Sequence, residues 1–583
     1  MPLRWALAAV AAAGLGTPLD GVAQAPTQAL DSVFDAVDVA GALPAVAMAV
    51  VHRGHVVYQR AAGFADLERR VRATTDTRFD WASVAKQFTG FALAQLVEEG
   101  LVSPSDDARR FLPELDLSGA RVTVDHLLRH TSGLEDVDGL LTLAGWAPGD
   151  LVYDRDVVDV LLRQQHLRWV PGDQEGYGNG GYALLAEIVA RVSGKSFAVY
   201  TDSAIFRRLG MERTSFPGSP HALVPDRALP YVKAPDGGFE LSRVDSYVGA
   251  GGLVGTVGDM ARWANHLLRP AVDAEATARI QEPGRLNSGE EIRYGWGIGT
   301  GSYRGLATLS HGGSGVATET YMVVFPGHDF AVVAASASPG IVNPVKVAHM
   351  AAEAFLGDLL EPVRPEGPGP RMILLTDSML STPPAESEGV VVPAALLAEV
   401  AGRYRFEDGT LLVVRPEGGR LAYARNGGLP TIPLFPVPEG GFVMMPLRDR
   451  YTFERDADGG VARLVVERRL PGREPTREVG ERVPAAPFDA VSAAPYVGWY
   501  YSDELRAVYE VALGAEGLEL RHAKHRAMPL VPLGTGADFG VAARLVRGVS
   551  FSRGPDGTAA GMELRALSWD ARSYFRRIAA PGG

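Results

Sequence analysis

The last third of the chain repeats itself. Three landmarks recur in the same order, 96 to 98 residues apart: 400–404 and 496–500, 433–436 and 529–532, and 453–459 and 551–557. The matching segments are short apolar runs separated by turns rich in Gly and Asp, a pattern typical of antiparallel strands. We therefore predict two copies of one small antiparallel β-barrel, at 393–483 and 484–583. Chance similarity between two β-rich segments is the alternative.

Proline and glycine separate this repeat from the rest of the chain. Six of the ten residues at 361–370 are Pro or Gly, and the same texture continues with interruptions to about residue 392. Such a stretch is typical of a linker, which we place at 361–392. Residues 26–360 then form one preceding domain.

Strand patterns occur at both ends of that preceding domain. Two apolar runs within 45–60 surround Arg53-Gly54, and the runs 321–325 and 330–335 surround Pro326-Gly327. Alternating apolar runs on either side of a Gly-containing turn predict a hairpin in each case. The domain therefore contributes strands from both of its ends.

Two segments between these hairpins have the spacing of amphipathic helices. Apolar residues within 85–97 fall on one face and are followed by Gly100, and those within 184–192 are followed by Gly194. Ser83 thus lies at the N-terminus of the first helix. Strands at both ends of a helical middle predict an α+β domain with an antiparallel sheet, rather than a βαβ repeat.

The first 25 residues have the pattern of an export signal. Arg4 is the only early charge, and an apolar run of about a dozen residues follows at 5–16. Ala23-Gln24-Ala25 fits a small-x-small cleavage site, although Pro26 would then follow the cut, so cleavage after Ala23 is a rival. A buried N-terminal helix is the alternative. No later apolar run is long enough for a membrane helix. We expect an exported protein, periplasmic or secreted, with no integral membrane segment in the mature chain.

Composition excludes several classes of protein. With 46% hydrophobic and 22% charged residues the chain is globular. It has no cysteine, which excludes disulfide frameworks, thiolate metal sites and thiol nucleophiles. The 57 basic and 69 acidic side chains give a net charge of −12, and no Lys/Arg run is present, so we expect no nucleic-acid partner.

Ser83-Val84-Ala85-Lys86 is an S-x-x-K tetrad. Side chains three residues apart on a helix share a face, so the ammonium of Lys86 can lie against the hydroxyl of Ser83. A helix N-terminus also offers free N–H groups to an oxyanion. The chain has only five lysines, which makes this placement informative. A capping serine followed by a surface lysine is the alternative.

Tyr177-Gly178-Asn179 lies in a Gly-rich loop just ahead of the second helix. An ammonium near Tyr177 would favour the ionised phenol, lower its pKa and let it take the serine proton. Asn179 could hold a substrate amide or the lysine. A buried structural tyrosine is the alternative.

His311-Gly312-Gly313-Ser314 opens the late hairpin. Glycines beside a strand let a substrate backbone approach closely, and the N–H of Ser314 could be a second oxyanion donor. His311 could relay or donate a proton near neutral pH. A turn carrying a surface histidine is the alternative.

In this order and setting, the three motifs resemble those of the penicillin-recognising serine hydrolases. This family includes class C β-lactamases, DD-carboxypeptidases, D-aminopeptidases and β-lactamase-like esterases. The resemblance covers about 40–357 and includes Phe79–Ala82, Val122–Leu134, Gly251–Leu253 and Tyr294–Gly297. It implies a β-lactamase/transpeptidase-like catalytic domain. The two C-terminal segments then resemble the lipocalin-like β-barrels that follow this domain in D-aminopeptidases.

The resemblance also implies residue roles. Ser83 would be the acylated nucleophile, and Lys86 and Tyr177 its activating pair. Asn179 would contact substrate and lysine, and His311 would be the third-motif residue. The backbone N–H groups of Ser83 and Ser314 would form the oxyanion hole, with Gly313 in the substrate-binding strand. No metal or organic cofactor is implied.

Three residues depart from the family pattern or bear on substrate charge. Gly178 replaces the serine usual in the second motif, and His311 stands where β-lactamases usually have lysine. Glu319 lies close to His311 in sequence, where its negative charge would disfavour a substrate carboxylate. We therefore expect an amine or neutral ester to be accepted better than a penicillin-like acid.

Other classes of hydrolase fit less well. His126 and His130, four residues apart, could share a helical face with Asp125 and bind zinc, but position 127 is Leu rather than the Glu of H-E-x-x-H. No G-x-S-x-G motif is present, which excludes an α/β-hydrolase elbow. A penicillin-binding sensor or adaptor that is acylated without turnover remains open because of Gly178.

The expected function is that of an exported serine hydrolase acting through an acyl-enzyme on an amide or ester, similar to D-aminopeptidases and DD-peptidases. A β-lactamase or short-chain esterase would use the same machinery. The expected partner is a small-molecule or short-peptide substrate, with cell-wall peptides among the candidates. The sequence leaves the oligomeric state open.

Overall fold

The computed structural model describes residues 27–580, apart from short gaps at 148–149, 235–236, 243–246, 363–382, 388, 408–409, 426–430, 446–447, 469–474, 485–489, 515–516, 534–537, 542–544 and 567–570. The expected export signal at 1–25 and most of the expected linker at 361–392 lie outside these residues. Contacts divide the chain into two units, one of Met1–Val137 and Gly149–Pro362, the other of Asp138–Pro148 and Val363–Gly583. None of the helices in the described ranges is long and apolar enough to cross a membrane.

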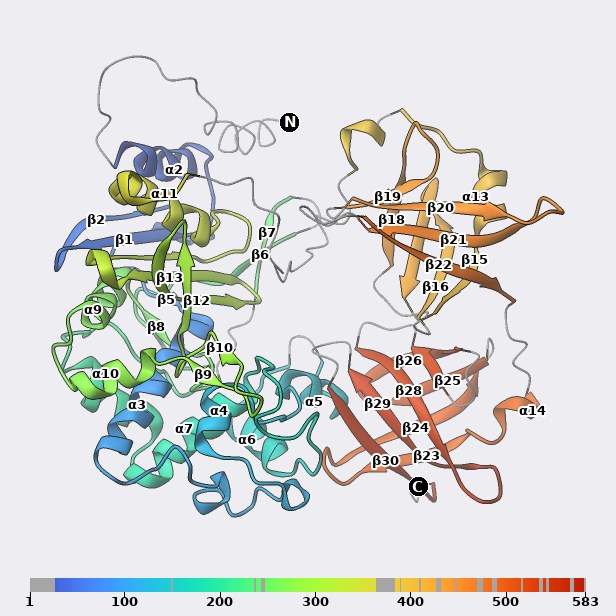
Figure 1. Ribbon diagram of the computed structural model, residues 1–583, viewed down its shortest axis with the longest axis horizontal. Helices are drawn as coiled ribbons and strands as arrows, with labels where there is room; N and C mark the ends of the chain where they lie inside the picture. The colour runs from blue at the N-terminus through green and yellow to red at the C-terminus, as the bar shows by residue number, and fades with distance from the viewer. Residues whose placement is uncertain are drawn as a thin grey trace. The chain divides into compact units, whose positions relative to one another are not determined.

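A six-stranded antiparallel sheet, built from both ends of its chain, forms the centre of the first unit (Figure 1). Its strand order is β11 (Gly299–Tyr303), β12 (Leu306–Gly315), β13 (Thr318–Phe325), β14 (Phe330–Ser336), β1 (Val46–His52) and β2 (His55–Ala62). Arg53 and Gly54 turn between β1 and β2 with φ of 54° and 84°, the left-handed conformation that a tight hairpin requires. Both predicted hairpins are confirmed, since β13 also pairs with β14.

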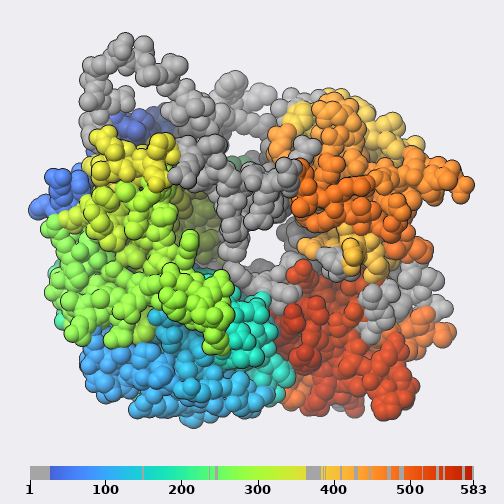
Figure 2. Space-filling model, in the orientation of Figure 1, coloured from blue at the N-terminus to red at the C-terminus, as the bar shows by residue number. Residues whose placement is uncertain are grey.

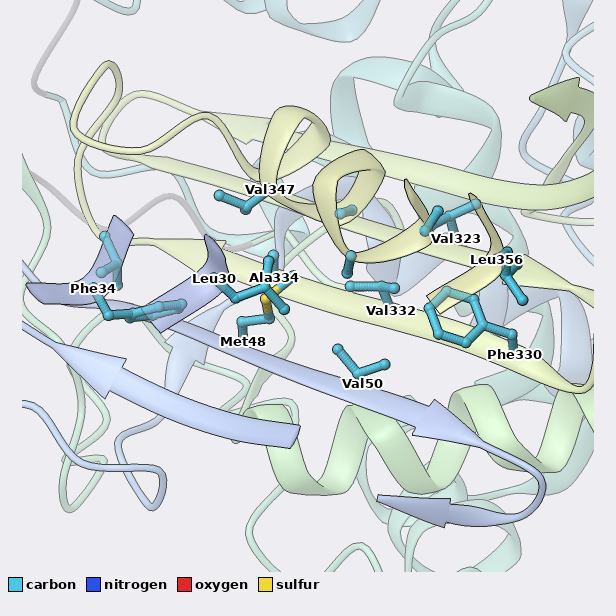
Figure 3. Packing of buried hydrophobic residues seen from close by; sticks show 14 of the residues in the cluster. Leu30, Phe34, Met48, Val50, Val323, Phe330, Val332, Ala334, Val347 and Leu356 are labelled. Atoms are coloured by element: carbon cyan, nitrogen blue, oxygen red, sulfur yellow. The ribbon is translucent and has the colours of Figure 1, made fainter. Parts of the chain in front are cut away.

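Helices cover both faces of this sheet. α2 (Gln28–Val39) and α11 (Pro344–Leu356) pack over one face, and α9 (Val257–Leu268) contacts β1 and β14. Figure 3 shows Leu30 and Phe34 of α2 meeting Met48 of β1 in one apolar cluster. The ends of this unit therefore close on each other, and blue and yellow surfaces adjoin in Figure 2.

The helical part surrounds α3 (Lys86–Glu98), which begins after the 3-10 turn η1 (Ala82–Ala85). Every residue of α3 from Lys86 to Leu96 is buried, whereas the sequence predicted one apolar face, because neighbouring helices pack around it. The other elements of this unit are α4 (Val124–Leu128), α6 (Asp154–Leu162), α7 (Gly180–Ser193), α8 (Phe197–Thr201), α10 (Ala274–Gln281), β3 (Phe64–Asp66), β4 (Val71–Arg72), β5 (Phe79–Asp80), β6 (Tyr231–Lys233), β7 (Phe239–Leu241), β8 (Val254–Gly255), β9 (Gly284–Arg285) and β10 (Glu291–Ile292). Gly194 caps α7 with φ of 68°, as predicted.

Two closed eight-stranded antiparallel barrels make up most of the second unit. The first contains β15 (Gly402–Phe406), β16 (Leu411–Glu417), β17 (Arg420–Arg425), β18 (Ile432–Pro436), β19 (Phe442–Met444), β20 (Asp449–Arg455), β21 (Val461–Arg468) and β22 (Thr476–Val483), preceded by α13 (Ala394–Val400). The second contains β23 (Gly498–Ser502), β24 (Ala507–Gly514), β25 (Gly517–His522), β26 (His525–Pro532), β27 (Asp538–Val541), β28 (Val546–Arg553), β29 (Ala559–Ala566) and β30 (Arg572–Ile578), preceded by α14 (Ala490–Ala493). Closure leaves neither sheet with an open edge.

The barrels share their internal hydrogen bonds, which confirms the repeat. The hydroxyl of Tyr404 donates to the carbonyl four residues before it at 2.6 Å, and that of Tyr500 does the same at 2.6 Å. Arg482 and Arg577 donate to the carbonyls of Ala401 and Val497 at 2.7 and 2.6 Å. Side chains at matching positions therefore make matching contacts in the two copies.

One segment from the middle of the chain belongs to the barrel unit. Residues 138–147, which include most of α5 (Val137–Leu143), lie against the second barrel. The hydroxyl of Tyr509 donates to the carbonyl of Leu143 at 3.1 Å, and the ammonium of Lys524 lies 5.2 Å from the ring centre of Trp146. Tyr509 pairs with Tyr500 in the second barrel, and the corresponding partner of Tyr404 in the first barrel is Leu412. The first barrel therefore has no hydroxyl at the position of Tyr509.

A substitution at Gly90 measures how tightly the surrounding chain encloses α3. A Cβ added there would lie 2.0 Å from the backbone oxygen of Trp296. In an ordinary helix Gly→Ala stabilises by about 1 kcal/mol, but here the methyl group meets backbone that cannot move aside. We expect Gly90→Ala to lower the free energy of unfolding by about 2 kcal/mol, measured by denaturant titration.

Gly357 provides the control for this measurement. It has φ of −49° and nothing within 4 Å of its added Cβ, so Gly357→Ala should leave the stability unchanged or slightly higher. Equal stability of the two variants would contradict the close packing of α3.

Candidate active site

Ser83 lies in the 3-10 turn η1, immediately before α3, where the sequence predicted the first residues of the helix itself. The preceding residue, Ala82, has φ of 43°, a left-handed conformation that is strained for a residue with a Cβ. Such strain persists only where surrounding contacts impose it. The turn is therefore held by its neighbours rather than by its own preference.

Those neighbours are the backbone and hydroxyl groups around β13. The hydroxyls of Thr318 and Thr320 donate to the carbonyls of Asp80 and Trp81 at 2.9 and 3.0 Å. Gly313 of β12 lies close by, because an added Cβ would be 2.4 Å from the oxygen of Trp81. Only glycine fits at this position, so the first and third motifs meet as the sequence predicted.

Lys86 is fully buried, and its amine nitrogen contacts three oxygen atoms. Nζ lies 3.1 Å from Oγ of Ser83, 2.8 Å from Oδ1 of Asn179 and 2.9 Å from the carbonyl oxygen of Ala250. Nδ2 of Asn179 donates to the hydroxyl of Tyr247 at 3.2 Å, which fixes its amide orientation. Two of the three oxygens can only accept, so they take two hydrogens of Nζ. The remaining position on Nζ faces Ser83. It carries a third hydrogen if Lys86 is an ammonium and a lone pair if Lys86 is a neutral amine.

Tyr177 lies beside this pair. Its ring centre is 4.9 Å from Nζ of Lys86. Burial raises the pKa of Tyr177, and the nearby hydroxyl of Ser83 only partly opposes this. The expected ionised phenol is therefore not what the surroundings favour, because the cost of burying a phenolate exceeds the stabilisation that the site provides. Tyr177 is therefore a neutral phenol beside the serine.

His311 is also neutral. Nδ1 lies 2.7 Å from the carbonyl oxygen of Gly312, which can only accept, so Nδ1 carries the hydrogen. Nε2 then accepts from the hydroxyl of Tyr294 at 2.9 Å. Burial, and next the charge of Lys86, lower the pKa of His311 to about 3. Both ring nitrogens are thus engaged, and the structure does not support the expected proton donation by His311 near neutral pH.

The open edge of the sheet lies beside these groups. β11 pairs with β12 only from Leu306 to Ser310, so the register leaves His311–Gly315 without a partner from β11. Gly312 and Ser314 are exposed on this stretch. An extended substrate could pair with this edge, as the sequence predicted for the glycines and for the N–H of Ser314.

Glu319 does not face the serine turn. It pairs with Ser314 across the hairpin and lies between Thr318 and Thr320, whose hydroxyls reach the turn. Because side chains alternate along a strand, Glu319 points to the opposite face, where it accepts from the N–H of Gly340 at 3.4 Å. The expectation that Glu319 bears on substrate charge is therefore wrong.

The two histidines considered for zinc do not share a helical face. α4 ends at Leu128, and His130 has φ of 58°. Nδ1 of His126 accepts from the N–H of Thr123, whereas Nδ1 of His130 accepts from the N–H of Gly178. His126 and His130 do not fit a shared metal site, because Nδ1 of each ring already accepts a hydrogen bond, and the two N–H donors belong to separate parts of the chain.

Sequence reasoning missed several contributors to this site, among them the hydroxyls of Tyr247, Thr318 and Thr320, the carbonyl of Ala250 and the side chain of Tyr294. The carbonyl of Ala250 has no residue-type signal, although Gly251–Leu253 follows it and was part of the resemblance. Tyr294 was noted only as part of Tyr294–Gly297, and its hydrogen bond to His311 could not be foreseen from their separation in sequence.

Residues 30–354 match the family model described as Beta-lactamase. This is more than half of the chain, and the protein belongs to the beta-lactamase family. The predicted family and the α+β domain followed by two barrels are thus confirmed.

Individual relatives agree with this assignment. The chain is 27% identical over 432 residues to penicillin-binding protein 4* of Bacillus subtilis (strain 168), covering 71% of this chain and 91% of that protein. It is 30% identical over 275 residues to a D-aminopeptidase of Gluconobacter oxydans (strain 621H), covering 46% of this chain and 51% of that protein. The octameric penicillin-binding protein homologue from Pyrococcus abyssi has the same fold, with a TM-score of 0.50 at 23% identity over 75% of this chain and 96% of that one.

The buried neutral His311 predicts a pH dependence of stability. Its folded pKa of about 3 lies below the ordinary 6.5, so between these values the unfolded chain binds a proton that the folded chain does not. Stability should therefore fall as the pH falls through this window. We expect His311→Gln to reduce the slope of unfolding free energy against pH by up to about 1.4 kcal/mol per pH unit, measured by urea titration from pH 7 to 4.

His55, which is exposed, serves as the control. His55→Gln should retain the slope of the unchanged protein. An unchanged slope in His311→Gln would show that His311 is not held neutral by the fold.

Proposed function

We propose that the protein is a serine hydrolase that forms an acyl-enzyme on Ser83 from an amide or ester and hydrolyses it. The observation that carries this proposal is the 3.1 Å contact between Oγ of Ser83 and the buried nitrogen of Lys86. With two hydrogens of Nζ given to Asn179 and Ala250, the amine form aims its lone pair at the serine hydroxyl. Lys86 is thereby the general base.

The chemical steps follow from this geometry. The proton of Ser83 passes to Nζ of Lys86 as Oγ attacks the substrate carbonyl carbon. Negative charge then develops on the carbonyl oxygen, where the backbone N–H groups of Ser83 and Ser314 stabilise it. Collapse of this intermediate breaks the bond to the leaving amine or alcohol, which takes the proton back from Lys86 through the neutral hydroxyl of Tyr177. Water repeats the sequence on the acyl-enzyme and releases Ser83.

The substrate class is argued from charge. His311 is neutral and stands where β-lactamases usually have lysine, so the third motif offers no fixed cation to a substrate carboxylate. The similarity to D-aminopeptidases supports an amide or short peptide of a D-amino acid, with neutral esters next. The sequence at 1–25 supports action outside the cytoplasm.

Replacing the nucleophile tests the proposed mechanism. Incubation with a reporter penicillin, a D-alanine p-nitroanilide and a p-nitrophenyl ester should give a covalent adduct or product, detected by intact-protein mass spectrometry and absorbance. Ser83→Ala should lose the adduct and at least about 10³-fold of the turnover. Ser105→Ala, at an exposed serine, should retain both. A stable adduct without product would identify a penicillin-binding sensor instead.

The absence of a fixed cation predicts the order of substrates. We expect kcat/KM for the D-alanine anilide or the ester to exceed that for the penicillin by at least about tenfold, a difference of about 1.4 kcal/mol in transition-state binding. Steady-state kinetics on the same preparation measures this. A faster reaction with the penicillin would contradict the argument from His311.

A further inference from the structure

Tyr177 is carried by a loop rather than by a helix or strand, so contacts must hold it in place. Its two neighbours in the chain are both bound by one residue. The N–H of Gly176 donates to the carbonyl oxygen of His130 at 2.8 Å, and the N–H of Gly178 donates to Nδ1 of the same histidine at 3.3 Å. Hydrogen bonds to His130 therefore hold the loop immediately before and immediately after Tyr177.

The ring of His130 also packs on the tyrosine itself. The two ring centres are 4.4 Å apart with planes inclined by 44°. His130 is only 4% exposed, and the rings of Tyr182 and Tyr294 lie on its other sides at 5.1 and 4.9 Å. One residue thus holds the loop on both sides of Tyr177: its backbone carbonyl binds Gly176, and its side chain binds Gly178 and packs against the tyrosine ring.

The backbone conformation and the burial of His130 both cost free energy. Its φ of 58° is a left-handed conformation, which is unfavourable for a residue with a Cβ. Because Nδ1 accepts from Gly178, Nε2 carries the hydrogen, and this buried N–H has no hydrogen-bond partner among the residues that the structure describes. Strained and unsatisfied groups of this kind concentrate at functional sites.

The ring must be neutral for its contact with Gly178. A protonated Nδ1 would be a donor and could not accept from the backbone N–H. Burial, with the charge of Lys86 as a smaller cause, holds the pKa of His130 well below its ordinary value. The acceptor is therefore available at neutral pH.

We propose that His130 is the positioning residue of Tyr177: it holds the tyrosine beside Ser83 by binding both flanking peptide groups and packing against the ring. His130 does not touch the substrate or exchange a proton. Its kinetic consequence rests on the proposed function, whereas its effect on the loop does not. The chemistry assigned to Tyr177 thus depends on a histidine 47 positions earlier in the chain.

Three variants of His130 separate the contacts. His130→Asn places an amide oxygen where Nδ1 stands and tolerates the left-handed conformation, so it retains the acceptor for Gly178. His130→Gln carries its oxygen further out, near the position of Nε2, and His130→Leu has no acceptor. The thermal midpoint of each variant is measured first, and Gln replaces Leu in the comparison if Leu does not fold.

The first readout is a double-mutant cycle with Tyr177→Phe. We expect His130→Leu to lower the acylation rate about 100-fold in the unchanged protein, because small displacements of a catalytic group have effects of this size. His130→Asn should remain within about tenfold. In the Tyr177→Phe background, His130→Leu should cost less than about threefold, because its effect passes through the missing hydroxyl. Equal losses in both backgrounds would overturn the proposal.

The second readout needs no activity. Hydrogen exchange of peptides covering 172–181 should be at least about tenfold faster in His130→Leu than in the unchanged protein, with His130→Asn in between. Peptides from the second barrel should exchange at the same rate in all variants. Unchanged exchange in 172–181 would overturn the anchoring role. If the unchanged protein is neither acylated nor active, the proposed function fails while this readout still tests the anchor.

Discussion

The structure of the site depends on one buried nitrogen. Lys86 has no contact with solvent, and a charged or basic amine in such a place is tolerated only where polar partners surround it. Its partners come from three separate parts of the chain: the turn that holds Ser83, the loop end at Asn179, and the carbonyl of Ala250. Satisfying this amine therefore brings the three segments together. Fold and chemistry share the same constraint, because the oxygens that stabilise Lys86 are those that direct it at the serine.

The surroundings of this amine are aromatic rather than acidic. The rings of Tyr177 and Tyr182 lie 4.9 and 5.7 Å from Nζ, and neutral His311 and His130 stand behind them. Aromatic faces stabilise a cation without a formal negative charge. A carboxylate in their place would hold Lys86 firmly as an ammonium and remove its basic form. The same surroundings keep both histidines uncharged, so the proposed acylation step moves only protons of the serine, the lysine and the tyrosine hydroxyl.

Much of this could be predicted from the sequence, and what could not has identifiable causes. Hairpins, the helix ending at Gly194 and the barrel repeat follow from local periodicity and turn residues, and local patterns are what a sequence states directly. The protonation of His311 depends on a hydroxyl from Tyr294 and a carbonyl from Gly312, and the first of these is set only by packing. The direction of Glu319 depends on the strand register, which one residue of slip would reverse. His130 was considered as a metal ligand because it lies four residues after His126. Spacing of this kind does not show that the Nδ1 lone pair of His130 already accepts a hydrogen bond from Gly178.

The barrel unit includes residues 138–147, which are synthesised long before the barrels themselves. Tyr509 and Leu143, which share a hydrogen bond, are 366 positions apart, and everything between them is made after the first partner and before the second. At a translation rate of 5–20 residues per second, Leu143 waits roughly 20 to 70 s for Tyr509. The preceding unit can complete its sheet from residues up to 362 during that time, while α5 stays without the surface that covers it. Severing the chain at the linker would likewise leave the barrels lacking a piece of their own structure, so the C-terminal third is not a detachable module.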